Sequence, residues 1–223
     1  LLSTDAELDL LRTIAELPDL VLRAAELRGP HRLAHYAQQL AAGFHRFYTE
    51  CRVITDDEPL TQARLWLSTG AKQAIAKAAA AMVDEGEAIA LDSSTTAYYL
   101  ALELRTKKEL VVVTNGLLIA AALADAPGIS VLVTGGMLRL HAMSLVGDLG
   151  ADVLRATRIS KGLLGARGLS IDSGLMDLNP DEVRIKRGRA GPITMPATIS
   201  STTEPSRRAG TGEQERRTEG DRR

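Results

Sequence analysis

Residues 88–96 read Ala-Ile-Ala-Leu-Asp-Ser-Ser-Thr-Thr, and this stretch decides the fold class. An apolar run long enough for a short buried strand is followed at once by residues that begin helices. Further strands are indicated at residues 110–114 and 129–134, with a helical pattern before each of them. Strands that alternate with helices predict βαβ units, and hence a parallel sheet with right-handed crossovers.

The turn after the first predicted strand has the chemistry of an anion site. Free backbone N–H groups and the positive end of the helix dipole meet at a helix N-terminus. The hydroxyls of Ser93, Ser94, Thr95 and Thr96 add donors there, and small side chains let the backbone approach an oxyanion. The same residue types are ordinary helix caps. The pattern alone therefore leaves both a phosphate site and a plain N-cap open.

Polar or glycine-rich turns follow the other predicted strands as well. Asn115 and Gly116 follow the second strand, Gly135 and Gly136 the third, and Gly165 ends the apolar run at residues 159–164. Each could be a simple turn, because Gly and Asn are usual turn formers. The carboxyl ends of parallel strands lie at one edge of a sheet, where open α/β sheets bind ligands. Together these turns favour a small-ligand site at that edge.

Residues 1–70 instead have helical spacing, with Pro18 and Gly29-Pro30 separating the predicted helices. The longest predicted helix has one apolar stripe, made of Leu33, Tyr36, Ala37, Leu40, Phe44, Phe47 and Cys51. His45, Arg46, Tyr48 and Arg52 lie off or beside this stripe. Aromatic rings next to cationic groups suit unpaired bases and phosphates, although a solvated basic face gives the same pattern. His31 and His35 have metal-ligand spacing, but no third ligand is evident, so no metal site is predicted.

Composition narrows the function classes. A net charge of -1 argues against a strongly basic nucleic-acid binder, although a local basic face remains compatible with it. The single cysteine, Cys51, excludes an internal disulfide framework and favours a reducing compartment, so we expect a cytoplasmic protein. The apolar stretch at residues 110–124 is too short and interrupted to span a bilayer. We expect no cofactor. The missing initiator Met predicts that the N-terminus is a fragment end.

Residues 188–223 are rich in Gly, Pro, Thr, Ser, Arg and Glu and have no apolar periodicity. Such a segment buries too little surface to offset its ordering entropy, so we predict disorder. The change follows Arg187, in mid-helix, which suggests a frameshift or a chimeric junction. With sheet strands missing beyond that point, Leu163, Leu164 and Ile185 are expected to lose part of their cover.

Residues 72–187 resemble the C-terminal effector-sensing domain of DeoR-type transcriptional repressors. The matching strings begin at Ala74, Ala90, Val112, Val133, Ser144, Leu164 and Gly174 and include Leu-Asp-Ser-Ser-Thr-Thr, Val-Val-Thr-Asn-Gly, Val-Thr-Gly-Gly and Ser-Leu-Val-Gly. The resemblance implies a fold like that of ribose-5-phosphate isomerases and glucosamine-phosphate deaminases, and a phosphorylated sugar as effector without catalysis. One departure is Met176, where the family more often has a small hydroxylated residue.

The resemblance also implies roles for individual residues. It assigns the phosphate to Ser93, Ser94, Thr95, Thr96 and Lys186, and it assigns the sugar to Asp92, Asn115, Gly135, Gly136, Asp177 and Glu182. Glu182 and Lys186 have a simpler alternative as an exposed i,i+4 helix pair. The family's helix-turn-helix has no counterpart here, so direct DNA binding is not expected.

Residues 1–72 resemble the C-terminal anticodon-binding domain of class I arginyl-tRNA synthetases, through the string His31 to Ile54 and the string Asp56 to Leu65. This resemblance implies tRNA contact, which we assign to Tyr36, His45, Arg46, Tyr48 and Arg52. It does not imply aminoacylation, because the catalytic core has no counterpart.

The sequence thus predicts an α/β fold, a truncated Rossmann-like parallel sheet, preceded by an all-α segment. The expected divisions are residues 1–71, 72–187 and 188–223. The preferred function is a sugar-phosphate sensor joined to a tRNA-binding-type segment. Its rivals are a fragment of an arginine-tRNA ligase and an isomerase-like enzyme using Asp92, Glu182 or Lys186 as acid–base groups. The sequence leaves the oligomeric state open, a homo-oligomer included.

Overall fold

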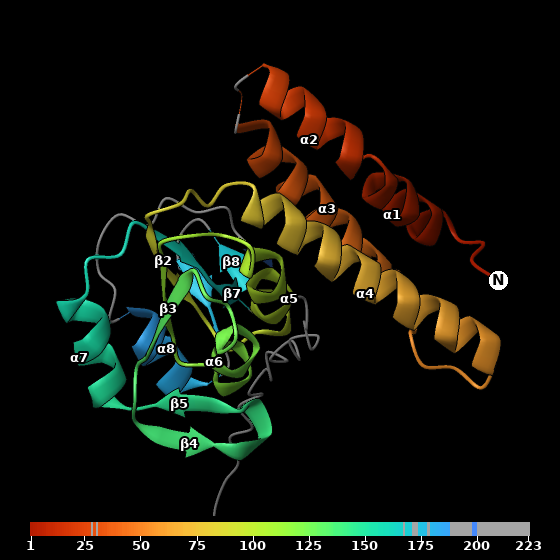
Figure 1. The fold of residues 1–223 in the computed structure, drawn as a ribbon. Coiled ribbons are helices and arrows are strands. Elements are labelled where there is room, and N and C mark those ends of the chain that lie inside the picture. Colours follow the sequence, from red (N-terminus) through yellow and green to blue (C-terminus); the bar gives the residue numbers. More distant parts are fainter. Residues whose placement is uncertain are drawn as a thin grey trace, which may run out of the picture.

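The computed structural model describes residues 1–27, 29, 31–166, 168–170, 174–177, 179–187 and 198–199. Four N-terminal helices lie along one side of an α/β unit (Figure 1). Most of the segment predicted to be disordered, residues 188–223, lies outside the described residues. Its described part, β10 (Thr198–Ile199), pairs in parallel with β7 (Gly165–Ala166), where composition alone predicts no regular structure.

The helical segment begins and ends its helices for local reasons. Thr4 caps the first helix and forms a reciprocal capping box with Glu7. Pro18 stands in the first turn of the second helix, where its missing N–H has no helical partner to lose. Asp57 caps the fourth helix by accepting from the Leu60 N–H at 3.0 Å. The four helices are α1 (Asp5–Ala15), α2 (Leu17–Glu26), α3 (His31–Glu50) and α4 (Glu58–Ala80).

The predicted apolar stripe of α3 is the centre of the helical core. Its seven residues are all buried, and Leu40 and Phe47 are completely so. They pack with residues of α1 and α4, among them Leu10 and Leu67. A buried ion pair that the sequence reading missed, Glu7–Arg64, also joins α1 to α4, with Arg64 Nε 2.6 Å from Glu7 Oε1. The segment is therefore held by apolar packing around one internal charge pair.

The α/β prediction is confirmed. A four-stranded parallel sheet has the order β3-β2-β1-β6, and its registers pair β1 with both β2 and β6. Its strands are β1 (Ala88–Leu91), β2 (Leu110–Thr114), β3 (Ile129–Val133) and β6 (Lys161–Leu163). The expected strands at 88–91 and 110–114 match in their bounds, because each is a β-branched or apolar run ended by turn residues.

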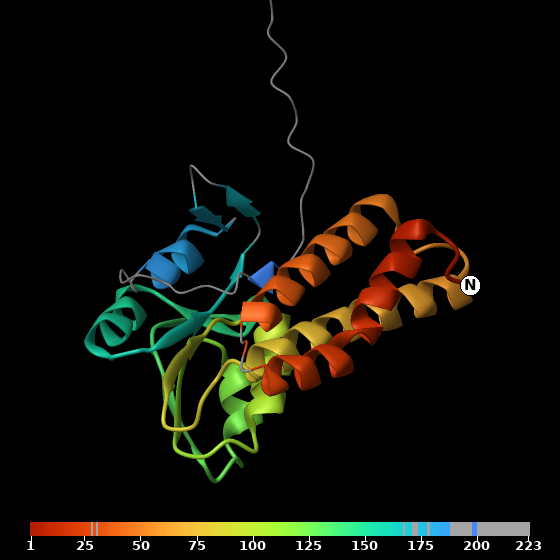
Figure 2. The same cartoon turned by 90° about the horizontal axis from the view of Figure 1, so that it is seen from above.

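Helices cover both faces of this sheet (Figures 1 and 2). Ile89 and Val112 pack against α4, α5 (Thr95–Leu104) and α6 (Leu117–Leu123). Ala90 and Val113, on the opposite face, pack against α7 (Asp148–Ala156) and α8 (Pro180–Arg187). A hairpin of β4 (Met137–Arg139) and β5 (Ser144–Val146), joined by the 3-10 helix η1 (Leu140–Ala142), extends beyond the sheet. A second hairpin pairs β8 (Gly168–Ser170) with β9 (Gly174–Met176).

Helix α4 belongs to both cores at once. Leu67 and Ala71 pack in the helical core, whereas Ala76 and Ala79 pack in the α/β core one turn later. The expected division between residues 71 and 72 falls inside this uninterrupted helix. Figure 2 shows α4 running from the helical segment onto the sheet. The two segments therefore share one rigid element and not a linker.

The expectation that Leu163, Leu164 and Ile185 lose their cover is wrong. Their exposed fractions are 4%, 8% and 4%. Leu163 packs in the core beneath α4 and α5, and Ile185 packs with Ala90, Val113 and Leu154. The reason is that α4 and α5 cover Leu163 on one face of the sheet, while β1, β2 and α7 cover Ile185 on the other face.

The described part of the chain contains neither a membrane-spanning helix nor a cluster of metal-binding side chains. Within it, no helix combines the length and the apolar character needed to cross a bilayer. Across those same residues, no group of His, Cys, Asp and Glu side chains is arranged to hold a metal ion.

Candidate functional site

The N-terminus of α5 stands at the carboxyl end of β1, as the sequence predicts. Ser94 is the N-cap, and its hydroxyl accepts from the Ala97 N–H at 3.2 Å. The Ser94 N–H donates to Asp92 Oδ1 at 3.2 Å, which tightens the turn. Thr95 is exposed and Thr96 is buried. The N–H groups of the first helical turn have no intrahelical acceptor, so this end of α5 can bind an anion.

Asp92 and Lys186 form the first of two charged clusters at this edge. Lys186 Nζ lies 3.1 Å from Asp92 Oδ2 and 2.6 Å from Asp177 Oδ2. It also donates to the Gly165 carbonyl at 2.6 Å. Asp92 Oδ2 in turn accepts from the Gly165 N–H at 2.8 Å. An ammonium has three protons to donate, and these three acceptors account for all of them.

The charge balance around Lys186 keeps it protonated. Burial lowers the pKa of the Lys186 ammonium, but the charge of Asp92 and the hydrogen bond and charge of Asp177 outweigh it, so the pKa is raised. The side chains of Lys186 and Asp92 are 15% and 5% exposed. Lys186 therefore serves as a fixed positive charge that orients Asp92. Its three ammonium protons are already used by Asp92, Asp177 and the Gly165 carbonyl.

Glu182 is the centre of the second cluster. Its Oε1 accepts from the Ser144 hydroxyl at 2.7 Å and from Arg139 NH1 at 2.8 Å. Its Oε2 accepts from Asn115 Nδ2 at 3.2 Å. The Asn115 amide also donates to the Leu145 carbonyl at 3.2 Å. These bonds tie α8 to the end of β2 and to the β4–β5 hairpin.

The exposed i,i+4 pair between Glu182 and Lys186 is excluded. Glu182 is buried, 6% exposed, and the two side chains join different clusters on either side of Ile185. Sequence reasoning missed the partners Arg139 and Ser144, which lie 43 and 38 residues from Glu182. The signal that could have indicated them is the Ser144-Leu-Val-Gly string, which already belonged to the resemblance.

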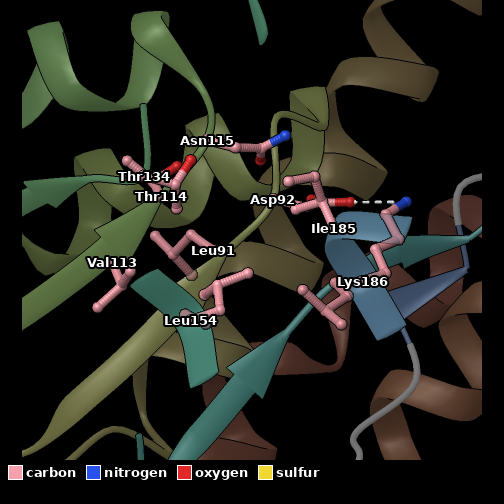
Figure 3. A pocket seen from close by; sticks show the side chains of 11 residues that line it. Leu91, Asp92, Val113, Thr114, Asn115, Thr134, Leu154, Ile185 and Lys186 are labelled. Atoms are coloured by element: carbon pink, nitrogen blue, oxygen red, sulfur yellow. Dashed lines mark ion pairs between the residues drawn. The ribbon is translucent and has the colours of Figure 1, made fainter. Parts of the chain in front are cut away.

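A small pocket opens between the sheet and α8 (Figure 3). Its polar lining comes from Asp92, Thr114, Asn115, Thr134 and Lys186, and its apolar lining includes Leu154 and Ile185. Figure 3 shows the Asp92 and Lys186 side chains facing each other across an ion pair.

A second pocket lies beside the first, between α4 and α5. Ser94 and Thr96 line it together with Ile75 and Leu163. Leu164 lines both pockets, and Gly165 stands where they meet. A Cβ on Gly165 would lie 2.9 Å from Ser94 Cβ, which is too close for any larger residue. Five of the residues assigned to the effector line these two hollows: Asp92, Asn115 and Lys186 line the first, and Ser94 and Thr96 line the second.

Gly135 and Gly136 lie at the start of β4, directly after Thr134. Both have positive φ, 76° and 116°, a conformation that suits glycine. A Cβ on Gly136 would collide with the Val146 carbonyl, so this glycine allows the β4–β5 hairpin to close. Neither residue lines the pocket, although Thr134 beside them does.

The residues assigned to tRNA divide into one buried and four exposed. Tyr36 is 2% exposed, and its hydroxyl donates to the Thr13 carbonyl at 2.8 Å. Burial and the nearby charge of Glu16 raise the pKa of Tyr36 to about 12. Tyr36 is therefore a core residue without a free ring face. His45, Arg46, Tyr48 and Arg52 are exposed, and Arg46 pairs with Glu50 at 3.0 Å and Asp9 at 3.1 Å.

Comparison with known proteins finds a different relative for each segment. The chain is 40% identical over 116 residues to the HTH-type transcriptional regulator GolR of Listeria innocua, covering 52% of this chain and 46% of that protein. It is 33% identical over 130 residues to a putative aga operon transcriptional repressor of Escherichia coli O157:H7, covering 58% and 48%. The N-terminal segment is 63% identical over 62 residues to the arginine–tRNA ligase of Heliobacterium modesticaldum, covering 28% and 11%.

The chain therefore spans about half the length of the regulators that it matches and a small part of the ligase. Two family models match, and they overlap along α4. The DALR anticodon binding domain matches residues 1–82, and the DeoR C terminal sensor domain matches residues 68–189. Because the second match covers more than half of the chain, the protein belongs to the family of the DeoR C terminal sensor domain.

Proposed function

We propose that this chain senses a phosphorylated sugar at the carboxyl edge of its parallel sheet. The proposal rests on one observation: Asp92 links the α5 N-terminus to the pocket beneath α8. It accepts from the Ser94 N–H at the helix and pairs with Lys186 in the pocket. One end of such a site suits an oxyanion, and the other end suits hydroxyl groups. Membership of the sensor-domain family supports this assignment, and the single cysteine is consistent with a cytoplasmic protein.

In this proposal each end of the effector has its own donors and acceptors. Backbone N–H groups and hydroxyls of residues 93–96 bind the phosphate, beside the fixed charge of Lys186. Asp92, Asn115, Asp177 and Glu182 contact sugar hydroxyls, and the backbone at Gly135 and Gly136 closes the far side. A carboxylate has about four acceptor positions, so Asp92 and Glu182 can each accept a hydroxyl beyond the contacts described above.

GolR and the aga repressor are described as transcription regulators, and a role in transcription follows here as part of the proposal.

A phosphorylated sugar should stabilise the chain, whereas the free sugar should not. Glucose 6-phosphate at about 100 times its dissociation constant should add roughly 2.7 kcal/mol to the free energy of unfolding. Thr95→Val removes an exposed hydroxyl at the α5 N-terminus and should abolish most of the thermal shift. Thr106→Val, the same change just beyond the other end of α5, is the control. Equal shifts with glucose and glucose 6-phosphate would refute the phosphate site.

A second activity, tRNA binding, is favoured by the anticodon-binding match and by the exposed face of α3. We propose that His45, Arg46, Tyr48 and Arg52 contact tRNA, while Tyr36 supports the helix from within the core. Arg46 is already paired with acidic side chains, so Arg52 is the cation most available to a phosphate.

Binding of tRNA should therefore be weak and strongly dependent on salt. With about two phosphate contacts, affinity should fall roughly tenfold between about 50 and 200 mM salt. Arg52→Gln should reduce the slope of log affinity against log salt by about one contact, whereas Arg12→Gln on α1 should leave it unchanged. Filter binding with labelled tRNA measures both slopes, and tight binding that ignores salt would contradict the assignment.

A further inference from the structure

The two cations at the ligand edge differ in how many donors remain to them. Lys186 is 15% exposed, and its three protons meet the acceptors on Asp92, Asp177 and Gly165. Arg139 is 32% exposed, and in the described part of the chain its side chain makes one hydrogen bond, from NH1 to Glu182. A guanidinium carries five N–H donors in a planar fork. Arg139 is thus the cation with donors left for a ligand.

The position of Arg139 follows from the hairpin. Its register partner on β5 is Ser144, and Ser144 forms a bridge with Gly116 at the end of β2. Gly116 in turn lies against Ser93, because a Cβ on it would stand 3.0 Å from Ser93 Cα. A continuous path of contacts therefore leads from the α5 N-terminus, through Gly116 and Ser144, to Arg139. Through Glu182, which also accepts from Asn115 at the end of β2, the guanidinium is held at the same edge of the sheet as the α5 N-terminus.

Glu182 does not cancel this role. Its carboxylate is buried and already accepts from Ser144 and Asn115 as well as from Arg139. The pairing holds the arginine in place through NH1, and within the described residues its other N–H groups make no further hydrogen bond. A planar guanidinium fork binds carboxylate and phosphate groups better than neutral hydroxyls.

We propose that Arg139 binds a second anionic group, a phosphate or a carboxylate, at the end of the effector remote from α5. This inference rests on the sugar-phosphate site proposed above. It narrows the effector class to sugars with two acidic ends, such as a sugar bisphosphate or a phosphorylated sugar acid. Arg139 then determines specificity, while residues 93–96 supply the common phosphate contact.

Three probes that share a six-carbon skeleton test the proposal by calorimetric titration of the full chain. Glucose 6-phosphate has a neutral far end, 6-phosphogluconate a carboxylate and glucose 1,6-bisphosphate a phosphate. At least one doubly anionic probe should bind roughly tenfold tighter than glucose 6-phosphate, as expected for a charge-assisted contact. The better of the two identifies the acidic group. Arg139→Gln should remove this preference, so that the three probes bind with similar affinities.

Variants separate this role from a structural one. Arg139→Lys keeps the charge and should retain part of the preference, whereas Arg155→Gln, an exposed arginine on α7, should retain all of it. If glucose 6-phosphate binds and neither doubly anionic probe binds more tightly, the inference fails while the phosphate site stands. If Arg139→Gln weakens all three probes equally, Arg139 is not the selective group. If no probe binds, the proposed function fails and this inference fails with it.

Discussion

Replacing Glu7 with Gln is expected to lower the free energy of unfolding by about 3 kcal/mol, because it leaves a buried arginine without its counter-charge. Glu7 is fully buried, and its Oε1 lies 2.6 Å from Arg64 Nε. Its Oε2 accepts from the N–H groups of Ser3 and Thr4, each at 2.9 Å. Arg64 also donates to the Arg52 carbonyl at 2.7 Å, so it cannot turn away to water.

The same pair makes stability depend on acidity. Burial raises the pKa of Glu7, but the backbone hydrogen bond from Thr4, the contact with Arg64 and the bond from Ser3 outweigh it and bring the pKa down from 4.5 to about 2. A carboxyl whose folded pKa is depressed contributes stability above its unfolded pKa and loses it as pH falls through the folded value. The contribution, about 3 kcal/mol, is therefore complete above about pH 5 and disappears towards pH 2.

Urea denaturation at several pH values measures both effects. The wild type should exceed Glu7→Gln by about 3 kcal/mol at pH 7, and the gap should close as pH falls from 4.5 towards 2. Glu26→Gln, an exposed carboxyl on α2, is the matched control and should change stability by less than about 0.5 kcal/mol. A gap that stays constant with pH would show that Glu7 acts through shape and not through charge.

Lys186→Met is expected to have a comparable effect at the ligand edge. The substitution keeps most of the apolar stem but removes the cation that pairs with the buried carboxylate of Asp92 and the half-buried carboxylate of Asp177. Removing one partner of such a cluster typically costs about 3 kcal/mol or more. The free energy of unfolding at pH 7 should fall by about that amount, whereas Lys77→Met, an exposed lysine on α4, should change little.

The free energy of unfolding at alkaline pH provides a separate test of the role of Lys186. Since its pKa is raised in the folded state, its contribution is complete below the unfolded pKa and is lost as pH rises through the folded one. The double variant Lys186→Met with Asp177→Asn should recover part of the loss, because Asp177→Asn removes one of the two negative charges that Lys186 balances. A double variant as unstable as the sum of its single changes would argue against a direct interaction.

Local sequence determined the first strand of the sheet, the helix cap that follows it and the apolar face of α3. The strand at 88–91 and the cap at Ser94 follow from a short apolar run and a hydroxyl at the next turn. The stripe of α3, from Leu33 to Cys51, follows from helical spacing. These features depend on residues within a few positions of one another, so periodicity and capping chemistry suffice to predict them.

Sequence also predicted which residues gather at the ligand edge, but not how they pair. Asp92 and Asn115 lie there because parallel strands end together. That Lys186 is held by Asp92, or that Glu182 bonds Arg139, depends on contacts between residues 94 and 43 positions apart. Ion pairs of this kind produce no periodic pattern in the sequence, because each partner is an ordinary polar residue in its own segment.

Tertiary structure alone decided three matters. It gave the Tyr36 hydroxyl, on the predicted apolar stripe, its partner in the Thr13 carbonyl of another helix. It buried Leu163 beneath α4 and α5, and it buried Ile185 against β1, β2 and α7. It also made α4 one helix through two family matches, because apolar and small side chains on its opposite faces bury themselves in different cores. A residue is buried by the side chains that pack against it. Those side chains come from distant parts of the chain, so the residue's neighbours in sequence do not reveal them.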